Sequence, residues 1–186
     1  MRLQCYSRCL AEAAPKSATF AGQIDRHYVE MLECCAPLHD IGKVGLPDHI
    51  LLKPGKLDAD ERVLMQAHTV IGSDLLKEVA GQHGQALAFL QMAIDITRHH
   101  HERYDGQGYP DRLAGTAIPL AARVVAFGDV YDALRSHKPF KPALTHSTAV
   151  HLMVNTQGQF DPALVQAFQR CHHQFERIFS ELADGR

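Results

Sequence analysis

The sequence predicts a single all-α domain of about seven helices. Its 186 residues, 46% of them hydrophobic, suit one domain that can bury a substantial core. Apolar residues recur at helical spacing along most of the chain, and Pro, Gly and helix-capping residues separate these periodic segments. No internal repeat or low-complexity linker divides the chain, so we expect one domain over residues 1–186.

The composition excludes several classes of protein. A net charge of −2 gives no general attraction to a nucleic acid polymer or an anionic membrane. No apolar run reaches the roughly 20 residues of a membrane span, and the N-terminus lacks a signal-peptide core. The five cysteines are odd in number and include the adjacent pair Cys34–Cys35, which suits reduced thiols better than a disulfide framework. We therefore expect a cytoplasmic protein.

The first half of the chain contains three expected elements. An amphipathic helix from Arg2 to Ala13 ends before Pro15. A second helix spans residues 27–41, where apolar residues recur at spacings near three; Pro37 should kink it one turn before His39, and Gly42 should end it. Residues 45–57 form a loop rich in Pro and Gly. Asp58 and Glu61 then make a capping box for a third helix, Ala59 to Val79, with His68 in its middle.

The second half begins after the break in GQHGQ. A helix is expected from Gln85 to Arg103, followed by a long glycine-rich loop, which in a compact domain is more often functional than not. An Ala- and Val-rich helix, Leu120 to Ser136, comes next. Either Thr145 or Ser147 could cap the following helix, which ends near Asn155. Asp161 caps the last helix, with Pro162 at its first position, and this helix runs to about Leu182.

Histidine and aspartate occur on four segments that are otherwise mostly apolar. Any one of them, taken alone, is most simply a hydrogen-bonded or exposed residue. Together they are harder to explain in that way, because burying a carboxylate without a cation or strong donors is costly. Mixed imidazole and carboxylate ligands suit iron, manganese, zinc or nickel and fit calcium poorly. The candidates are His39, Asp40, His68, two of the three residues His99, His100 and His101, and Asp129, with Asp132 either sharing the partner of Asp129 or facing outward.

Three motifs carry a resemblance to a known family. The chain contains HDIGK (39–43), then HHE followed closely by DGQGYP (100–110), then ARVVAFGDVYDAL (122–134). In this set the chain resembles the HD-GYP subgroup of the HD phosphohydrolase superfamily along nearly its whole length. The resemblance implies an all-helical domain that degrades cyclic di-GMP with two or three metal ions, often iron.

The resemblance also implies residue roles. Asp40 matches a carboxylate that bridges two metal ions, and His99 lies outside the family pattern. Lys43 could hold a phosphate oxygen, and Asp40 and Lys43 are the expected catalytic residues. The metal ligands implied are His39, Asp40, His68, His100, His101 and Asp129.

The glycine-rich loop has a role of its own in the family. It helps receive the substrate and contacts diguanylate cyclase domains, with Gly106 and Gly108 allowing a tight path at positive φ. The family prefers Arg and Tyr where this chain has Lys138 and Phe140, and Lys lacks the two-pronged geometry of Arg. The substrate-binding residues implied are Lys43, Gly108, Tyr109, Lys138 and Lys141.

One departure concerns the start of the chain. Family members carry the pattern E-x-x-x-H-x-x-R ahead of the His-Asp pair, and Arg2 matches its Arg. The Glu and His would precede residue 1, so we expect residues 1–186 to be an HD-GYP domain that lacks the start of its first helix. His27 matches no ligand position. We therefore expect the metal site with His39 and Asp129 to be less complete than the site with His68, His100 and His101. We also expect the first helix to have an open edge that permits a homodimer.

The resulting interpretation is a phosphodiesterase that hydrolyses cyclic di-GMP to the linear dinucleotide, to GMP, or to both. The enzyme would use two divalent metal ions. Iron or manganese is the expected metal, and zinc or nickel is also suitable. Two alternatives stay open: a degenerate module that binds cyclic dinucleotide or partner proteins with little turnover, and an HD hydrolase of another phosphate ester. Cys34 and Cys35 are expected in the core. The remaining histidines are expected not to bind metal: His49, His83, His137, His146, His151, His172 and His173.

Overall fold

The computed structural model describes residues 2–16, 18–83, 87–137 and 142–182. Over these ranges the chain is helical, with one isolated β-bridge between Asp105 and Ala114, so the predicted all-α class is confirmed. The α-helices are α1 (Arg2–Ala13), α2 (Arg26–Cys35), α3 (Asp48–Leu51), α4 (Ala59–Gln66), α5 (His68–His83), α6 (Leu87–His99), α7 (Leu120–Arg135), α8 (His146–Asn155) and α9 (Pro162–Glu181). The 3-10 segments are η1 (Ala14–Lys16), η2 (Ala18–Phe20), η3 (Ala36–Gly45) and η4 (Gly115–Ala117).

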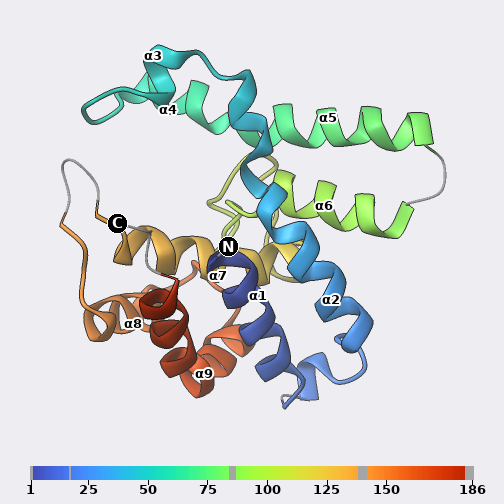
Figure 1. The fold of residues 1–186 in the computed structure, drawn as a ribbon, viewed down its shortest axis with the longest axis vertical. Helices are drawn as coiled ribbons and strands as arrows, with labels where there is room; N and C mark the ends of the chain where they lie inside the picture. The colour runs from blue at the N-terminus through green and yellow to red at the C-terminus, as the bar shows by residue number, and fades with distance from the viewer. Residues whose placement is uncertain (1, 17, 84–86, 138–141, 183–186) are drawn as a thin grey trace.

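The helices form two connected groups (Figure 1). The helices α1, α7, α8 and α9 make a bundle, and α5 and α6 run side by side above it. The segment η3 packs against both α5 and α6, while α1 packs against α2, α7 and α9. The segment that carries α3 and α4 projects to one side (Figure 1). None of the described helices is both long and apolar enough to cross a bilayer.

Buried aromatic side chains hold the bundle together. Tyr6 of α1 stacks on Phe175 of α9 with ring centroids 4.8 Å apart, and it meets the edge of Tyr131 of α7 at 5.3 Å. Phe168 packs edge-on against Phe175 at 5.1 Å. Such aromatic pairs add about 0.5–1.5 kcal/mol each beyond the area they bury. Three helices far apart in the sequence are thereby joined through one aromatic cluster.

The predicted helix starts in the polar segments are confirmed. Asp58 and Glu61 form the full capping box at α4. Of the two candidates at α8, Thr145 is the cap: its hydroxyl accepts from the backbone N–H of Thr148. Asp161 caps α9 with Pro162 at the first helical position.

The expected helix over residues 27–41 is wrong in its second half. The helix α2 ends at Cys35, and residues 36–45 continue as the 3-10 segment η3 with Pro37 near its start. Pro37 has no N–H to donate to the preceding turn, which removes one α-helical hydrogen bond at this point. Gly42 does not end the segment but lies buried inside it. In the same region Cys34 is exposed, contrary to expectation, whereas Cys35 is fully buried in the core.

Two further helix boundaries differ from those expected. The predicted helix over residues 59–79 breaks at Ala67, so that His68 opens α5 instead of lying mid-helix. The helix α6 ends at His99 and not at Arg103, so His100 and His101 follow its last turn. Both changes place histidines at helix ends. There the neighbouring turns restrict a side chain less than they do inside a helix.

Candidate metal centre

Asp40 is the residue on which the site converges. It follows His39 in η3, and His39 donates from Nδ1 to the carbonyl oxygen of Ala36 at 3.0 Å. This bond leaves Nε2 of His39 facing Asp40 Oδ2 at 3.2 Å. The carboxylate of Asp129, from α7, lies 3.9 Å from the same nitrogen. Two carboxylates and one imidazole thus meet between η3 and α7.

His68 and His100 face the other carboxylate oxygen of Asp40. His68 donates from Nδ1 to the Met65 carbonyl at 2.6 Å, and its Nε2 lies 3.4 Å from Asp40 Oδ1. His100 donates from Nδ1 to the Ile96 carbonyl at 3.0 Å, and its Nε2 lies 4.0 Å from the same oxygen. A metal-binding histidine is typically held in this way, with one ring nitrogen on a carbonyl and the other free for the ion.

The atoms that face one another here are buried and lack partners. Within the described part of the chain, Asp40 Oδ1, His68 Nε2 and His100 Nε2 take part in no hydrogen bond. Each such atom costs about 1–3 kcal/mol when it stays unsatisfied. With His101 included, one ligand atom from each of the four residues lies within 4.8 Å of the others. Three imidazoles and one carboxylate fit a divalent transition-metal ion, which would satisfy all the orphaned atoms at once.

The electrostatics favour the forms that bind a metal. Burial lowers the pKa of His68, and lowers that of His100 well below its usual value. Burial, with a contribution from His68, lowers the pKa of His101 to about 3. Although its own burial opposes ionisation, His39 and Lys43 hold the pKa of Asp40 below its usual range. The neutral imidazoles of His68, His100 and His101 therefore lie beside an ionised carboxylate, whereas, although burial acts against it, Asp40 and Asp129 raise the pKa of His39.

Lys43 also belongs to this site. Its ammonium contacts Asp40 Oδ2 and its side chain is 38% exposed. The same carboxylate therefore has its Oδ1 turned toward His68 and His100 and its Oδ2 toward His39 and Lys43. An ammonium group that is both paired and partly open to solvent can reach an incoming anion without crossing the core.

The glycine-rich loop closes one side of the site. The ring of Tyr109 lies 4.9 Å from that of His101, centroid to centroid. Gly108 does not have the positive φ expected of it; instead, a Cβ there would lie 2.4 Å from the Cα of Glu102, so the loop folds back tightly. Gly106 does have positive φ, 77°. A hollow of about 600 Å³ adjoins the loop, lined by Val63, Gln66, Ala67, Val70, Gly106, Gln107, Gly108, Tyr109, Pro110 and Arg112.

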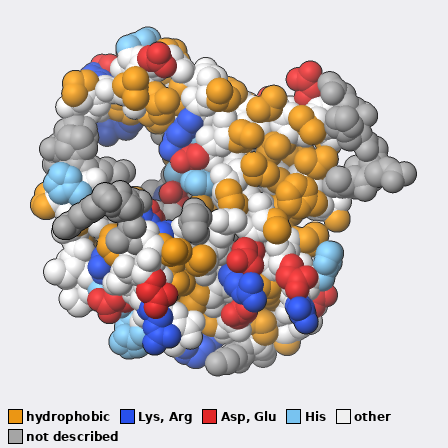
Figure 2. All heavy atoms as spheres, in the orientation of Figure 1, with side chains coloured by type: hydrophobic (Ala, Val, Ile, Leu, Met, Phe, Trp, Pro, Cys, Tyr) orange, Lys and Arg blue, Asp and Glu red, His pale blue; other side chains and the backbone are white. Residues whose placement is uncertain are grey.

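The hollowed character of this face is visible in the space-filling view. Figure 2 shows a depression bordered by the segment with α3 and α4, with basic, acidic and histidine side chains at its inner edge. Several large apolar side chains of that segment and its neighbours are exposed, including Val44 at 80% and Leu52 at 72%.

The structure brings all six residues expected as metal ligands into one region. They form two overlapping groups that share Asp40: His39 with Asp129, and His68 with His100 and His101. Asp132 belongs elsewhere, because it pairs with Arg2 at 2.7 Å. Lys138 and Lys141, expected to face phosphate, lie outside the described residues.

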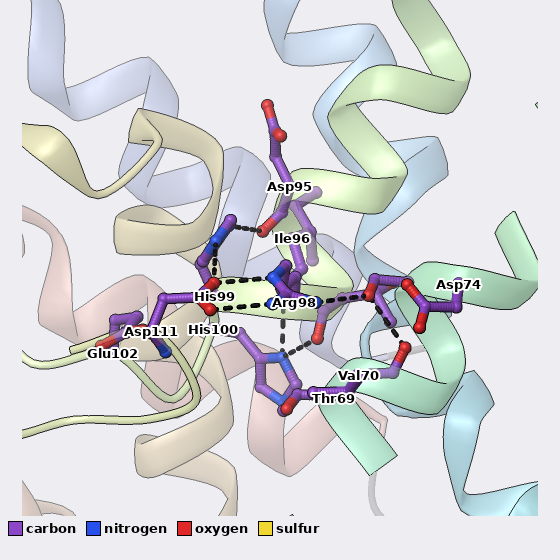
Figure 3. A network of polar contacts seen from close by, with 12 residues as sticks. Thr69, Val70, Asp74, Asp95, Ile96, Arg98, His99, His100, Glu102 and Asp111 are labelled. Carbon is purple, nitrogen blue, oxygen red and sulfur yellow. Dashed lines mark hydrogen bonds and ion pairs between the residues drawn. The ribbon is translucent and has the colours of Figure 1, made fainter. Parts of the chain in front are cut away.

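His99 turns away from this site into a second network, which the sequence did not indicate (Figure 3). Its Nε2 lies 3.1 Å from Asp111 Oδ2, and Arg98 binds both oxygens of Asp111 at 2.6 and 2.8 Å. The buried carboxylate of Glu102 accepts the backbone N–H of Asp111 at 2.7 Å. The end of α6 is thereby tied to the loop just after Tyr109. The pairing joins residues about a dozen positions apart through an irregular loop, which no helical period can predict.

Comparisons with known proteins give a family match and several relatives. Residues 9–164 match the HD domain family. The whole chain is 43% identical to 38% of a cyclic di-GMP phosphodiesterase from Vibrio cholerae. Over 83% of the chain it is 46% identical to 40% of the cyclic di-GMP phosphodiesterase response regulator RpfG from Xanthomonas campestris. Over 83% of the chain it is also 38% identical to 29% of 3'3'-cGAMP-specific phosphodiesterase 2 from V. cholerae. The chain thus spans less than half the length of each of these relatives.

Proposed function

The chain belongs to the HD domain family, and on that premise we propose that it is a metal-dependent phosphodiesterase that hydrolyses cyclic di-GMP. The observation that carries the proposal is the convergence of Asp40, His68, His100 and His101, whose facing atoms are buried and include three without partners. The names of the relatives supply the substrate class: those at 43% and 46% identity are cyclic di-GMP phosphodiesterases.

Two divalent ions would be held by overlapping ligand sets. His39, Asp40 and Asp129 would hold one, and Asp40, His68, His100 and His101 the other. When bound, such ions act as Lewis acids on the phosphate and lower the pKa of water toward neutrality. Asp40 would bridge them, since its two oxygens face the two groups separately. Iron or manganese is the proposed metal, with zinc and nickel as alternatives that the same ligands suit.

The remaining residues act on the substrate. In the proposed reaction, water attacks phosphorus, the bond to the ribose 3′ oxygen breaks, and that oxygen takes a proton. Lys43 would contact a non-bridging phosphate oxygen and stabilise the negative charge that grows there. Tyr109 would place its ring against a base or sugar at the mouth of the hollow. Lys138 and Lys141 would face the phosphates. One cleavage gives the linear dinucleotide, and a second gives GMP.

A second candidate substrate has a specific observation in its favour. Relatives named 3'3'-cGAMP-specific phosphodiesterases match at 38%, 32% and 35% identity. Metal ligands recognise the phosphodiester and not the base, so both cyclic dinucleotides fit the same centre. A module that binds the dinucleotide with little turnover is the remaining alternative. We also assign contacts with diguanylate cyclase domains to the glycine-rich loop, where Gln107 is exposed.

The test is a hydrolysis assay on the purified protein. Cyclic di-GMP, 3'3'-cGAMP and the linear dinucleotide are supplied separately with Mn²⁺ or anaerobic Fe²⁺, and products are separated by chromatography. We expect cyclic di-GMP to be cleaved fastest. Asp40→Asn keeps the size of the side chain but removes its charge, and it should abolish turnover and lower the bound metal. Asp74→Asn, on an exposed carboxylate of α5, is the matched control and should change neither. Tight binding of cyclic di-GMP without any product would favour the binding module instead.

A further inference from the structure

A second group of histidines lies away from the candidate metal centre, between α8 and α9. His146 opens α8, and His172 and His173 lie in the middle of α9. One ring nitrogen from each of the three lies within 4.8 Å of those of the other two. No pattern in the sequence indicates this cluster, because His146 and His172 are 26 positions apart and no periodicity connects them.

The contact between His146 and His172 is short enough for both rings to bind one ion. Nε2 of His146 is hydrogen-bonded to Nδ1 of His172 at 3.0 Å, and an ion between them would replace this bond. With metal–nitrogen bonds of about 2.1 Å, neighbouring ligands lie about 3.0 to 3.4 Å apart and opposite ligands about 4.2 Å apart. Glu176, one helical turn after His172, places Oε2 at 3.9 Å from His146 Nε2. Three imidazoles therefore lie within reach of one ion, and Glu176 lies beside His146 as a fourth side chain that would have to move toward the ion.

The buried side of the cluster supports His146 in the way that metal ligands are usually supported. The hydroxyl of Tyr131, which is fully buried, lies 2.7 Å from His146 Nδ1. With the proton on Nδ1, His146 donates to this hydroxyl and presents the lone pair of Nε2 to His172. A hydrogen bond on the far nitrogen fixes both the orientation and the tautomer of a ligating ring.

The cluster is accessible, and His146 and His172 favour the neutral form that binds a metal. It lines a hollow of about 590 Å³ together with Ser147, Val150, His151, Val154, Asn155 and Gln169. Burial lowers the pKa of both His146 and His172, so neither ring competes for protons at neutral pH. The hollow therefore offers an ion a route to His146 and His172, whose rings are neutral ligands.

We propose that His146, His172, His173 and Glu176 form a second metal site, separate from the candidate metal centre, for a borderline transition-metal ion such as Zn²⁺ or Ni²⁺. Imidazole-rich sites with one carboxylate favour these ions over Mg²⁺ or Ca²⁺. The separation follows from α7: Asp129 belongs to the first centre and Tyr131 to the second, and two residues turn an α-helix by about 200°. An ion here would fasten the start of α8 to α9 and, through Tyr131, to α7.

The decisive measurement locates the ion in the unmodified protein. Crystals grown with ZnCl₂ should give an anomalous difference peak at the zinc edge, about 2.0–2.1 Å from His146 Nε2 and His172 Nδ1. The same peak should be present whether or not the first centre is filled. A map with zinc at Asp40 and His100 and none between α8 and α9 would overturn the proposal.

Calorimetry in solution tests the proposed ligands by substitution. In a His68→Ala/His100→Ala background, which weakens the first centre, Zn²⁺ should still bind at one site. Adding His146→Asn and His172→Asn should weaken this binding by at least about 100-fold, because half of the four ligands are removed. Glu176→Gln, at a half-exposed position, should weaken it by about tenfold.

A matched control uses the same hollow. His151→Asn removes an exposed imidazole of α8 that bonds Asn155 and lies outside the cluster, and it should leave zinc affinity unchanged. Circular dichroism of each metal-free variant verifies that it is folded. Equal weakening by His151→Asn would mean that zinc binds to the histidines of the hollow at large and would refute the four-ligand site. So would undiminished binding in the His146→Asn/His172→Asn protein.

Discussion

Gly42 of η3 lies directly against the backbone of His68 at the start of α5. A Cβ added to Gly42 would lie 1.9 Å from the carbonyl oxygen of His68 and 2.4 Å from the backbone nitrogen of Gly72. Only a residue without a side chain permits this approach. The contact is what brings Asp40, two residues before Gly42, within 3.4 Å of the His68 ring.

Gly42→Ala should therefore damage the metal centre as well as the fold. Backbone atoms cannot rotate out of the way, so η3 and α5 must separate, and we expect a loss of about 3 kcal/mol in the free energy of unfolding. Metal affinity should fall at least about tenfold as Asp40 moves away from His68. Urea unfolding and metal titration measure the two effects.

Gly81→Ala is the control for that change. Gly81 also lies in α5, but nothing lies within 4 Å of an added Cβ. Alanine favours a helix over glycine by up to about 1 kcal/mol, so this variant should be slightly more stable and bind metal normally. If Gly42→Ala behaved in the same way, the approach of η3 to α5 would not be what sets the site.

Lys43→Ala should separate catalysis from metal binding. The lysine contacts Asp40 but is not expected to be a metal ligand, and a charge-assisted contact to the phosphate is worth about 2–4 kcal/mol in the transition state. We expect kcat for cyclic di-GMP to fall about 10²–10³-fold with metal content unchanged. Lys77→Ala, an exposed lysine paired with Asp74, should have no effect on either quantity. An empty metal site in Lys43→Ala would mean that Lys43 mainly holds Asp40 in place.

Asp111→Ala should loosen the glycine-rich loop. It removes the two-pronged bond from Arg98 and the contact with His99, both at an exposed position. We expect the protein to lose about 0.5–1 kcal/mol of stability and KM to rise more than kcat falls, because fewer contacts then hold the loop of Tyr109 to α6. The Asp74→Ala variant removes a single exposed partner and should change stability by less than about 0.5 kcal/mol. A selective fall in kcat, with KM unchanged, would contradict this positioning role.

The metal-free protein should lose stability as the pH falls. In the folded state the pKa values of His68, His100 and His101 are lowered, that of His101 to about 3, whereas an unfolded histidine titrates near 6.5. Below about pH 6.5 the unfolded chain therefore binds more protons, and the stability present above that pH is progressively lost toward the folded pKa values.

The size of this effect follows from the same linkage. Between pH 7.5 and 5.5, His101, with its folded pKa of about 3, should reduce the free energy of unfolding by about 1 kcal/mol, and His68 and His100 act in the same direction. His39 opposes the trend: although burial acts against it, Asp40 and Asp129 raise its pKa, and it stabilises the fold at the lower pH. Urea unfolding at the two pH values, with chelator present, should show a net loss that His101→Asn diminishes. Equal stability at both would show that these rings are solvated in solution.

How well a structural feature can be predicted from the sequence depends on how far apart in the chain its interacting residues lie. Helix caps are local, and Asp58 with Glu61 and Asp161 with Pro162 are visible in the sequence because a few residues decide them. The break at Ala67 is not visible in the sequence, since helical propensity is continuous there; the segment that follows it, α5, packs against η3. Local patterns also give the wrong role for Gly42. Its role depends on contact with the backbone of His68, which lies 26 residues later in the sequence.

The functional residues show the same difference between local and long-range features. The motifs around Asp40, His100 and Asp129 identify a region that the structure does assemble, because the resemblance to a family carries three-dimensional information that spacing alone lacks. Asp111 and His146 belong to no such motif. Their partners, Arg98 and His172, are brought to them by a loop and by the packing of α9, and these long-range contacts require coordinates.

The pairing of α1 with α9 has a consequence for how the chain acquires its fold. Tyr6 finds its stacking partner, Phe175, only after α9 has been synthesised, because the two are 169 residues apart. Contacts of such long separation slow folding, since a large loop must close before they form. The residues of the candidate metal centre, by contrast, have all emerged once α7 is complete. We therefore expect the nascent chain to hold its ligands close to one another while α1 still awaits its aromatic partner, a stage at which exposed apolar surface makes chaperone capture most useful.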